Sequence, residues 1–234
     1  MGIIKTSGII LLESNSGDFD KMVTLLTPGY GKIGCSAKGA RRNRSALLAG
    51  TQFLSFGEYV IYKGIDRYSI NSCEPIEIFY NIRTDLDKLN YASEMANIVR
   101  NVTNENDNCY KILQLLLNTL YTISETNMNL SFVLSIFKLR LACILGYTPN
   151  IQGCKGCKTQ ENLMYFSIKD NSFKCGTCAK QDKSVIQISE GTKDAIKYIV
   201  LAPPKKLYSF NISERCIREL ELIAKLYLED KLSY

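Results

Sequence analysis

An α+β protein of two domains is predicted by three features of this 234-residue chain. The first 80 residues contain short apolar runs separated by turn residues, which is typical of a small β-barrel. From residue 84 the apolar residues recur every three or four positions, which indicates helices. Two Cys-x-x-Cys pairs follow, and their spacing is typical of a zinc ribbon. We therefore expect an OB-type barrel over residues 1–80 and a helical domain over residues 81–234, with the ribbon inserted at about residues 151–182.

About five strands are expected in the first domain. Turn residues such as Asn15-Ser-Gly17 and Pro28-Gly-Tyr-Gly31 separate the apolar runs. In the last run, strict alternation places Tyr68, Ile70, Ile76 and Ile78 on one face of the strand. The expected strands cover residues 3–12, 21–27, 32–37, 53–63 and 68–80.

Helical periodicity then runs through most of the second domain. Thr84 and Asp87 resemble a capping box at the start of the first helix, which continues through Val99. The segment 130–145 is apolar nearly all round, so we expect it at the centre of a helical bundle, ended by Gly146. The other helices are expected over residues 110–124, 192–201 and 213–229, with a break at Pro203-Pro204.

The cysteine quartet is the sharpest motif in the chain. Four thiolates in two pairs, separated by a hairpin with a strand at residues 163–167, suit the tetrahedral coordination of one Zn²⁺. Such a site has no open position for water or substrate, so its expected role is structural. Disulfide chemistry and a second soft metal are the alternatives. The expected ligands are Cys154, Cys157, Cys175 and Cys178.

The positive charge of the chain gathers in one stretch. The net charge is +6, and no acidic residue lies between Asp20 and Glu58. The densest part, Lys38-Gly-Ala-Arg-Arg-Asn-Arg44, follows the third expected strand, so it lies at the barrel rim, where it suits a phosphate chain. A solvated basic loop is the plain alternative. The candidate DNA-binding residues are Lys21, Tyr30, Lys32, Lys38, Arg41, Arg42 and Arg44.

Aromatic residues near this stretch offer stacking surfaces for bases. Tyr30 is the first candidate because it lies in the turn between two basic strands. The acidic pair Asp18 and Asp20 is better explained by turn and strand capping than by a metal site. The remaining aromatic residues, which are more typical of a core, are Phe53, Phe56, Tyr59 and Tyr62.

Several classes of protein are disfavoured by composition. The chain has no histidine, which removes the usual general base, every imidazole triad and every histidine-ligated zinc site. It has no Walker loop either, so we expect no nucleotide hydrolysis, and an enzyme would need carboxylates or lysines alone. Nine cysteines, five of them scattered singly, fit reduced cytosolic thiols. We read no signal peptide and no membrane segment, so a cytoplasmic protein is expected.

An ordered set of short motifs resembles the RecO family of bacterial recombination mediators. The amino-terminal part of the set is Lys5-Thr-Ser-Gly-Ile-Ile10, Gly17-Asp-Phe-Asp-Lys21, Thr27-Pro-Gly-Tyr-Gly-Lys32, Ala37-Lys-Gly-Ala-Arg-Arg42 and Phe56-Gly-Glu58. The resemblance continues through Leu139-Arg-Leu141, Leu145-Gly-Tyr-Thr-Pro149 and the cysteine quartet, so it covers most of the chain in order.

The resemblance implies a DNA-binding OB barrel, a helical domain with a zinc ribbon, and no catalytic centre. It also implies association with the bacterial nucleoid. It implies annealing of complementary strands and, with RecR, loading of a RecA-type recombinase on gapped DNA coated by single-strand-binding protein. It also implies that the helical domain binds the carboxyl-terminal tail of that binding protein. The nearest basic candidates for that contact are Lys205, Lys206, Arg215 and Arg218. The competing hypothesis is a protein–protein adaptor without DNA affinity.

Overall fold

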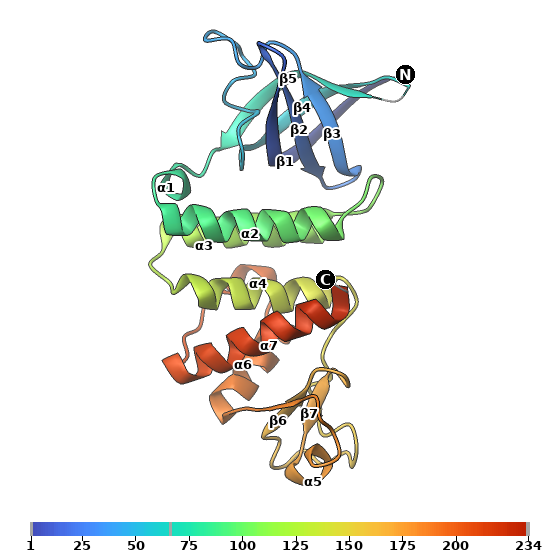
Figure 1. Cartoon of the computed structure of the whole chain (residues 1–234), viewed down its shortest axis with the longest axis vertical. Helices are drawn as coiled ribbons and strands as arrows, with labels where there is room; N and C mark the ends of the chain where they lie inside the picture. Colours follow the sequence, from blue (N-terminus) through green and yellow to red (C-terminus); the bar gives the residue numbers. More distant parts are fainter. Residues whose placement is uncertain (1, 66, 233–234) are drawn as a thin grey trace. The chain divides into compact units, whose positions relative to one another are not determined.

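Two compact units make up the computed structural model, which describes residues 2–65 and 67–232 (Figure 1). The first unit, Met1–Glu125, is called the barrel unit, and the second, Thr126–Tyr234, is called the ribbon unit. The division at residue 125 groups the first three helices with the barrel. Among the described residues, no helix is long and apolar enough to cross a membrane.

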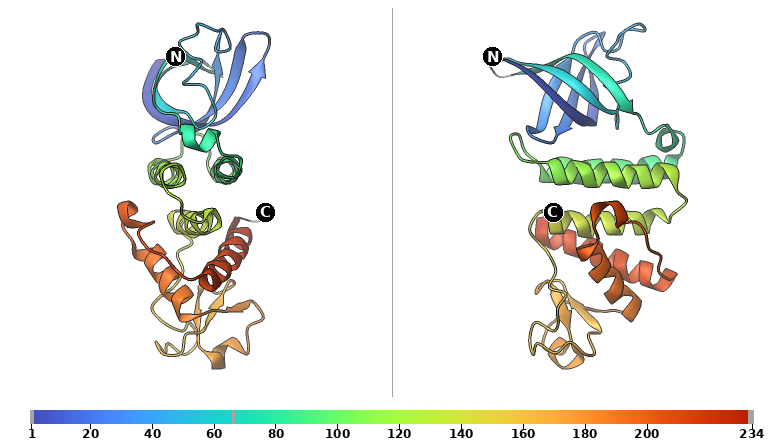
Figure 2. Two further views of the ribbon diagram at one scale, coloured as in Figure 1. Left: turned by 90° about the vertical axis from the view of Figure 1, so that its left-hand side faces the viewer. Right: turned by 180° about the vertical axis from the view of Figure 1, so that it is seen from behind.

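Five strands close the barrel in the order β1-β2-β3-β5-β4. β1 pairs with β4 through its first half and with β2 through its second half, and a β-bulge at Leu11 bends it between the two partners. A short parallel pairing of β3 with β5, at Cys35 and Tyr68, completes the closure (Figure 2, left). The expected OB-type fold is confirmed. The strands are β1 (Gly2–Ser16), β2 (Asp20–Thr27), β3 (Gly31–Ala37), β4 (Phe56–Lys63) and β5 (Tyr68–Glu77).

Alternate residues of these strands fill the barrel interior. Tyr59 is 1% exposed, and its hydroxyl donates to the Gly50 carbonyl (2.7 Å), which fixes the long β3–β4 connection against the core. Burial of these apolar side chains stabilises the barrel by about 1.5–3 kcal/mol each. The interior includes Ile10, Val23, Leu25, Ile33, Cys35, Tyr59, Ile61 and Ile70.

The alternation expected in β5 is wrong in its second half. Tyr68 and Ile70 are buried, but Ile76 is 60% exposed and Ile78 is 37% exposed. The register of β5 against β4 shifts after Ile70, which leaves Asn71 as an extra residue, and shifts again at Ile76. Each extra residue reverses the side-chain alternation, so a strict period of two fails beyond the first bulge.

Three helices complete the barrel unit: α1 (Tyr80–Arg83), α2 (Leu86–Val102) and α3 (Tyr110–Glu125). The expected capping box is wrong, because Thr84 ends α1 and Asp85 begins α2 by accepting the N–H groups of Asp87 and Lys88. The α2–α3 connection docks on the β2–β3 turn, where the N–H of Asn106 donates to the Tyr30 carbonyl (2.9 Å). Gly31, at φ +67°, permits this approach because a Cβ there would overlap the carbonyl oxygen of Asn104.

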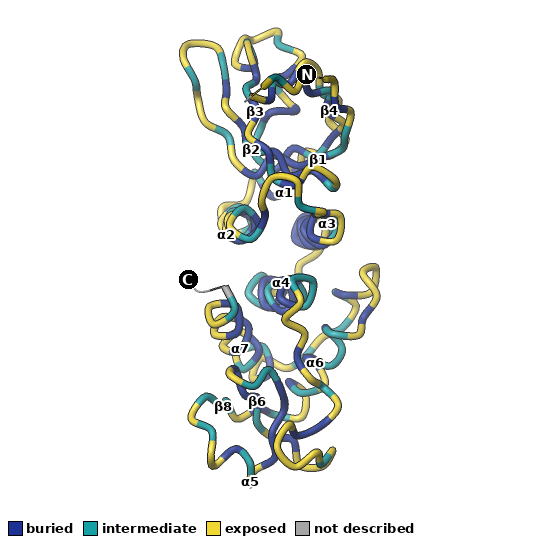
Figure 3. Tube along the Cα trace, turned by 90° about the vertical axis from the view of Figure 1, so that its right-hand side faces the viewer, coloured by how far each residue is buried: buried dark blue, intermediate teal, exposed yellow. Residues whose placement is uncertain are grey.

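In the ribbon unit, α4 (Leu130–Ile144) packs against α6 (Glu190–Leu201) and α7 (Glu214–Leu232). Every residue of α4 is buried or half-buried, which confirms its expected central place (Figure 3). The one arginine of α4, Arg140, donates to the carbonyls of Ile199, Val200 and Ala202 at the carboxyl end of α6. A cation at this position satisfies carbonyls that a helix end leaves without partners.

The ribbon is built from very short elements. A three-stranded sheet in the order β7-β6-β8 uses β6 (Tyr165–Ser167), β7 (Ser172–Lys174) and β8 (Val185–Gln187). One turn of helix, α5 (Gly176–Ala179), carries the last cysteine of the quartet, and a 3₁₀ turn, η1 (Pro204–Lys206), follows α6. The sequence predicted only the strand at β6, because three-residue strands show no periodicity.

Candidate nucleic-acid interface and metal centre

The segment 38–44, called the basic loop, is fixed to the β1–β2 turn by three hydrogen bonds, each of which involves at least one backbone group. The N–H of Gly39 donates to Asp20 Oδ1 (2.7 Å), the N–H of Arg41 donates to the Phe19 carbonyl (2.9 Å), and Arg41 Nη1 donates to the Gly17 carbonyl (3.1 Å). Asp20 therefore caps the loop, as the sequence predicted for this acidic pair. Residues 17–20 and 38–44 together form one surface, called the basic rim.

The cations of the basic loop face outward. Lys38, Arg41, Arg42 and Arg44 are all exposed, and no ion pair joins them to an acidic side chain within the described residues. Cations without an acidic partner keep their full attraction for an external anion. Four of them on one fixed loop suit a chain of phosphates, from which bound counterions are released.

Lys32 and Tyr30 lie at the other end of the same strands. Lys21 pairs with Ala37 at the basic rim, whereas Thr27 pairs with Gly31, so the β2–β3 turn is about 20 Å away along the strands. Lys32 Nζ donates to the carbonyl of Arg100 (2.6 Å), and Tyr30 is 37% exposed. The strand register thus separates these two residues from the basic rim.

Lys21 is close to the basic rim but is turned into the barrel unit. Its residue is 8% exposed, and its ammonium group pairs with Glu13. Glu13 also accepts the N–H of Phe53 (2.9 Å), so it ties Lys21 to the β3–β4 connection. A buried, paired ammonium has little charge to offer an external phosphate. A DNA contact by Lys21, Tyr30 or Lys32 stays a prediction that this geometry does not favour.

The aromatic residue at the basic rim is Phe19, which the sequence analysis missed. Its side chain is 51% exposed, and the guanidinium carbon of Arg42 lies 5.2 Å from the centre of its ring. The available signal was an aromatic residue between two aspartates in the first hairpin turn. Of the aromatic residues named earlier, Tyr59 is in the core, Phe53 and Phe56 are half-buried, and Tyr62 is 40% exposed.

The four cysteines of the quartet converge as the sequence predicted. Their Sγ atoms all lie within 4.8 Å of one another, and Cys157 Sγ is 3.6 Å from Cys175 Sγ. A Zn²⁺ ion with four thiolates at about 2.3 Å places sulfurs about 3.8 Å apart, so the group fits a metal ion of this type. Gly156 is needed in the first pair because a Cβ there would lie 2.8 Å from Cys178 Sγ.

Electrostatics of the quartet also suit a cation. Burial raises the pKa of the Cys154 thiol, but backbone N–H groups of Cys157, Cys175 and Gly156 outweigh burial and bring that pKa to about 6. Hydrogen bonds shared with the other thiols raise the pKa of Cys178 to about 12. The thiolates of Cys154 and Cys175, whose pKa values are both lowered, are therefore favoured, and that of Cys178 is opposed. A divalent cation bound here would allow all four thiols to ionise.

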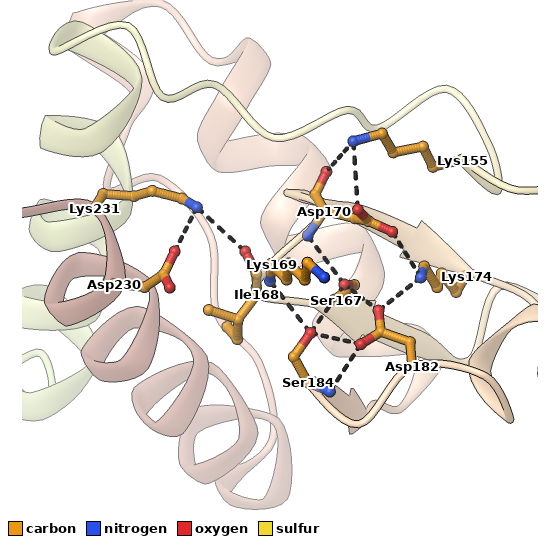
Figure 4. Close-up of polar contacts among 10 residues, drawn as sticks. All are labelled: Lys155, Ser167, Ile168, Lys169, Asp170, Lys174, Asp182, Ser184, Asp230 and Lys231. Carbon is orange, nitrogen blue, oxygen red and sulfur yellow. Dashed lines mark hydrogen bonds and ion pairs between the residues drawn. The ribbon is translucent and has the colours of Figure 1, made fainter.

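A polar cluster beside the quartet stiffens the ribbon (Figure 4). Lys174 Nζ lies between Asp170 (2.7 Å) and Asp182 (2.6 Å), and Asp182 also accepts from Ser184 (2.7 Å). Burial raises the pKa of Asp182, but hydrogen bonds from Lys174, Ser167 and Ser184 outweigh burial and hold that pKa well below its usual range. Lys231 of α7 donates to the Ile168 carbonyl (3.4 Å), which links the ribbon to the helices.

The four basic candidates of the carboxyl-terminal region are all exposed. Lys205 and Lys206 belong to η1, and Arg215 and Arg218 belong to α7. Arg215 Nε donates to Glu219 (3.0 Å), one turn further along the helix. Among the described residues this is the one ion pair found for the four.

Comparison with known families and proteins finds matches over nearly the whole chain. Residues 1–79 match the family model "Recombination protein O N terminal", and residues 83–233 match "Recombination protein O C terminal". The chain is 42% identical to a DNA repair protein RecO of Acetivibrio thermocellus over 99% of this chain and 93% of the relative. It is 33% identical to a RecO of Alkaliphilus metalliredigens, over 97% and 92%. It is 28% identical to a RecO of Bacillus subtilis, over 97% and 89%. The chain thus belongs to the RecO family of DNA repair proteins.

Proposed function

We propose that this protein is a non-enzymatic, DNA-binding mediator in the recombinational repair of gapped DNA. The observation that carries the proposal is the basic rim, where four exposed cations are held on one fixed loop of an OB-type barrel. Loops and grooves of OB barrels are common sites of single-strand binding. Both single- and double-stranded DNA present the phosphate chain that this loop suits.

Strand annealing follows from the same charges. Two complementary strands repel each other through their phosphates, and Lys38, Arg41, Arg42 and Arg44 lower that repulsion by neutralising phosphates and releasing counterions. The bases are then free to pair. No nucleotide hydrolysis is required for this step, in keeping with a chain that has no histidine and no Walker loop.

Protein partners are proposed on the strength of family membership. They are RecR, the carboxyl-terminal tail of single-strand-binding protein and, indirectly, a RecA-type recombinase. The purified chain is expected to anneal complementary strands coated with single-strand-binding protein. Failure on coated strands, with success on bare ones, would count against the contact with that protein.

Zn²⁺ is the proposed metal of the quartet, with one ion bound by Cys154, Cys157, Cys175 and Cys178. The fit of four thiolates and the absence of an open ligand position support a structural role. The ion would hold the first pair to α5 and so keep the short sheet of the ribbon closed. The chain's own contribution is the set of N–H groups that favours the Cys154 thiolate.

The central experiment replaces Lys38, Arg41, Arg42 and Arg44 with alanine and measures affinity for a single-stranded oligonucleotide at several salt concentrations. The slope of log affinity against log salt should flatten by about 0.7 for each lost phosphate contact. A matched control replaces four exposed lysines of the ribbon unit, Lys169, Lys183, Lys205 and Lys206, and should keep the native slope.

Two results would contradict the proposal. An unchanged slope in the basic-loop variant would remove this loop from the DNA interface. A native chain that fails to bind single-stranded DNA at low salt without partners would favour the competing function, a protein–protein adaptor. In that case the ribbon and the helices would form the surface that binds the partner protein.

A further inference from the structure

Phe19 is a large aromatic side chain fixed at the middle of the basic rim. Its carbonyl accepts the N–H of Arg41 (2.9 Å), and its neighbour Asp20 accepts the N–H of Gly39 (2.7 Å). The guanidinium of Arg42 covers one part of the ring, 5.2 Å from its centre, and half of the residue is still exposed. The ring is therefore presented to solvent in a defined position and contributes little to the barrel core.

The strand surface next to Phe19 carries no charge. On the outer face of β1, β2 and β3, Ser14, Met22 and Ser36 stand opposite one another in one row. The next row is Leu12, Thr24 and Gly34. Leu12 and Met22 are each 44% exposed, and Gly34 leaves the third strand without a side chain. The cations of the rim thus border a neutral and partly apolar surface.

From this arrangement we infer that Phe19 stacks on an unpaired base, so that the basic rim selects single-stranded over double-stranded DNA. The inference rests on the DNA-binding function proposed above. A nucleic acid strand offers anionic phosphates and apolar base faces, and the rim with its neighbouring strands offers cations and an exposed ring. In a duplex the bases are already stacked and paired, so Phe19 gains nothing from them. Only a single strand satisfies both parts of the surface.

The experiment compares two single-stranded probes of the same length and charge. One is oligo(dT), and the other is an abasic oligonucleotide that keeps the sugars and phosphates but has no bases. Native protein is expected to bind oligo(dT) more tightly. Phe19→Ala is expected to lose about 5- to 150-fold in affinity for oligo(dT), the equivalent of one stacked base, and to bind the abasic probe and a duplex like native protein.

Further variants separate stacking from the packing of Arg42. Phe19→Tyr keeps a ring and should retain affinity, whereas Phe19→Leu keeps apolar bulk without a ring and should behave like Phe19→Ala. Tyr30→Ala tests the competing aromatic candidate, which lies in the other turn of the same strands. It should bind oligo(dT) like native protein. Thermal unfolding of each variant checks that the fold is intact.

Three outcomes would overturn the inference. They are native affinity of Phe19→Ala for oligo(dT), an equal loss on the abasic probe, and a loss in Tyr30→Ala in place of Phe19→Ala. These outcomes would not contradict the proposed DNA-binding function. That function is contradicted by a different result, an unchanged salt dependence of the basic-loop variant on both probes. If the basic-loop variant has a flattened salt slope and Phe19→Ala binds oligo(dT) like native protein, the DNA-binding function is supported and only the proposed preference for single strands is rejected.

Discussion

Lys38, Arg41, Arg42 and Arg44 of the basic loop are exposed, whereas Lys174 of the ribbon is 8% exposed and lies between two carboxylates. Both regions are rich in basic residues, which are lysine and arginine in the loop and lysine alone in the ribbon. In the ribbon the charge of Lys174 is neutralised by Asp170 and Asp182, so this residue stabilises the short sheet. The cations of the basic loop have no acidic partner among the described residues. The ionic partners of a basic residue therefore indicate better than its position in the sequence whether it stabilises the fold or is available to bind an anion.

Both regions are held by links between segments that are distant in sequence. In the basic rim the links are hydrogen bonds between the basic loop and residues 17–20, and in the ribbon they are thiols and buried ion pairs. Loss of a link in the ribbon should therefore affect stability, and loss of a cation in the rim should affect binding. The variants below test whether ribbon residues affect stability and rim residues affect DNA binding.

The largest effect is expected for Cys175→Ser. One of four ligands is lost, so stoichiometric binding of one tightly held Zn²⁺ should disappear and the ribbon should unfold, because the binding energy of a structural metal is also folding energy. Metal analysis and thiol alkylation measure the loss. DNA affinity should stay native at temperatures where the barrel unit is folded, and a flattened salt slope in this variant would contradict the separation.

Lys174→Ala should destabilise the ribbon unit by about 3 kcal/mol, because it leaves Asp170 and Asp182 without their cation in a partly buried site. Chemical unfolding measures the change. A double variant, Lys174→Met with Asp182→Leu, removes both charges and should recover part of the loss. Equal instability of the single and double variants would show that the cluster acts through its shape alone.

Gly31→Ala tests the barrel unit at the end away from the basic rim. A Cβ there overlaps the carbonyl oxygen of Asn104 and is strained at φ +67°, so the free energy of unfolding should fall by about 2–3 kcal/mol. Oligonucleotide affinity of the folded protein should not change. Gly29→Ala, in open space in the same turn, is the control.

The smallest effect is expected for Glu219→Gln, and it depends on pH. Burial raises the pKa of Glu219, but hydrogen bonds from the N–H of Ser189 and from the hydroxyls of Thr192 and Ser189 outweigh burial and bring it to about 2. Since the folded pKa lies below the unfolded value of about 4.3, the carboxylate stabilises the protein above that pH. The pKa difference corresponds to about 3 kcal/mol, and solvent screening reduces the expected stabilisation to about 2 kcal/mol.

The stabilisation by Glu219 is lost as the pH falls from about 4.3 toward 2. Unfolding of native protein and Glu219→Gln, compared at several pH values, should show a difference at pH 7 that shrinks on acidification. The difference between the two proteins isolates Glu219 from the other acids. A difference that is constant with pH would mean that the shape of the side chain, and not its charge, is what matters.

Much of the fold could be predicted from the sequence because it depends on local patterns. The five strands, the central helix α4 and the cysteine quartet follow from apolar runs, turn residues and spacing. The buried positions of β5 beyond Ile70 could not be predicted, because β-bulges shift the strand register and the sequence pattern does not show where they occur. The cap at Asp85 in place of Thr84 was missed because two neighbouring polar residues both suit a helix start.

The sequence alone was enough to predict the fold class, the four cysteines of the candidate metal centre and the position of the basic loop, because each depends on residue types and short spacings. Only the tertiary structure decided which residues share a surface. It turned Lys21 toward Glu13, placed Lys32 and Tyr30 in the far part of the hairpin, and brought Phe19 against Arg42. The physical reason is that strand pairing and barrel closure join segments distant in sequence, and no local pattern records those partners.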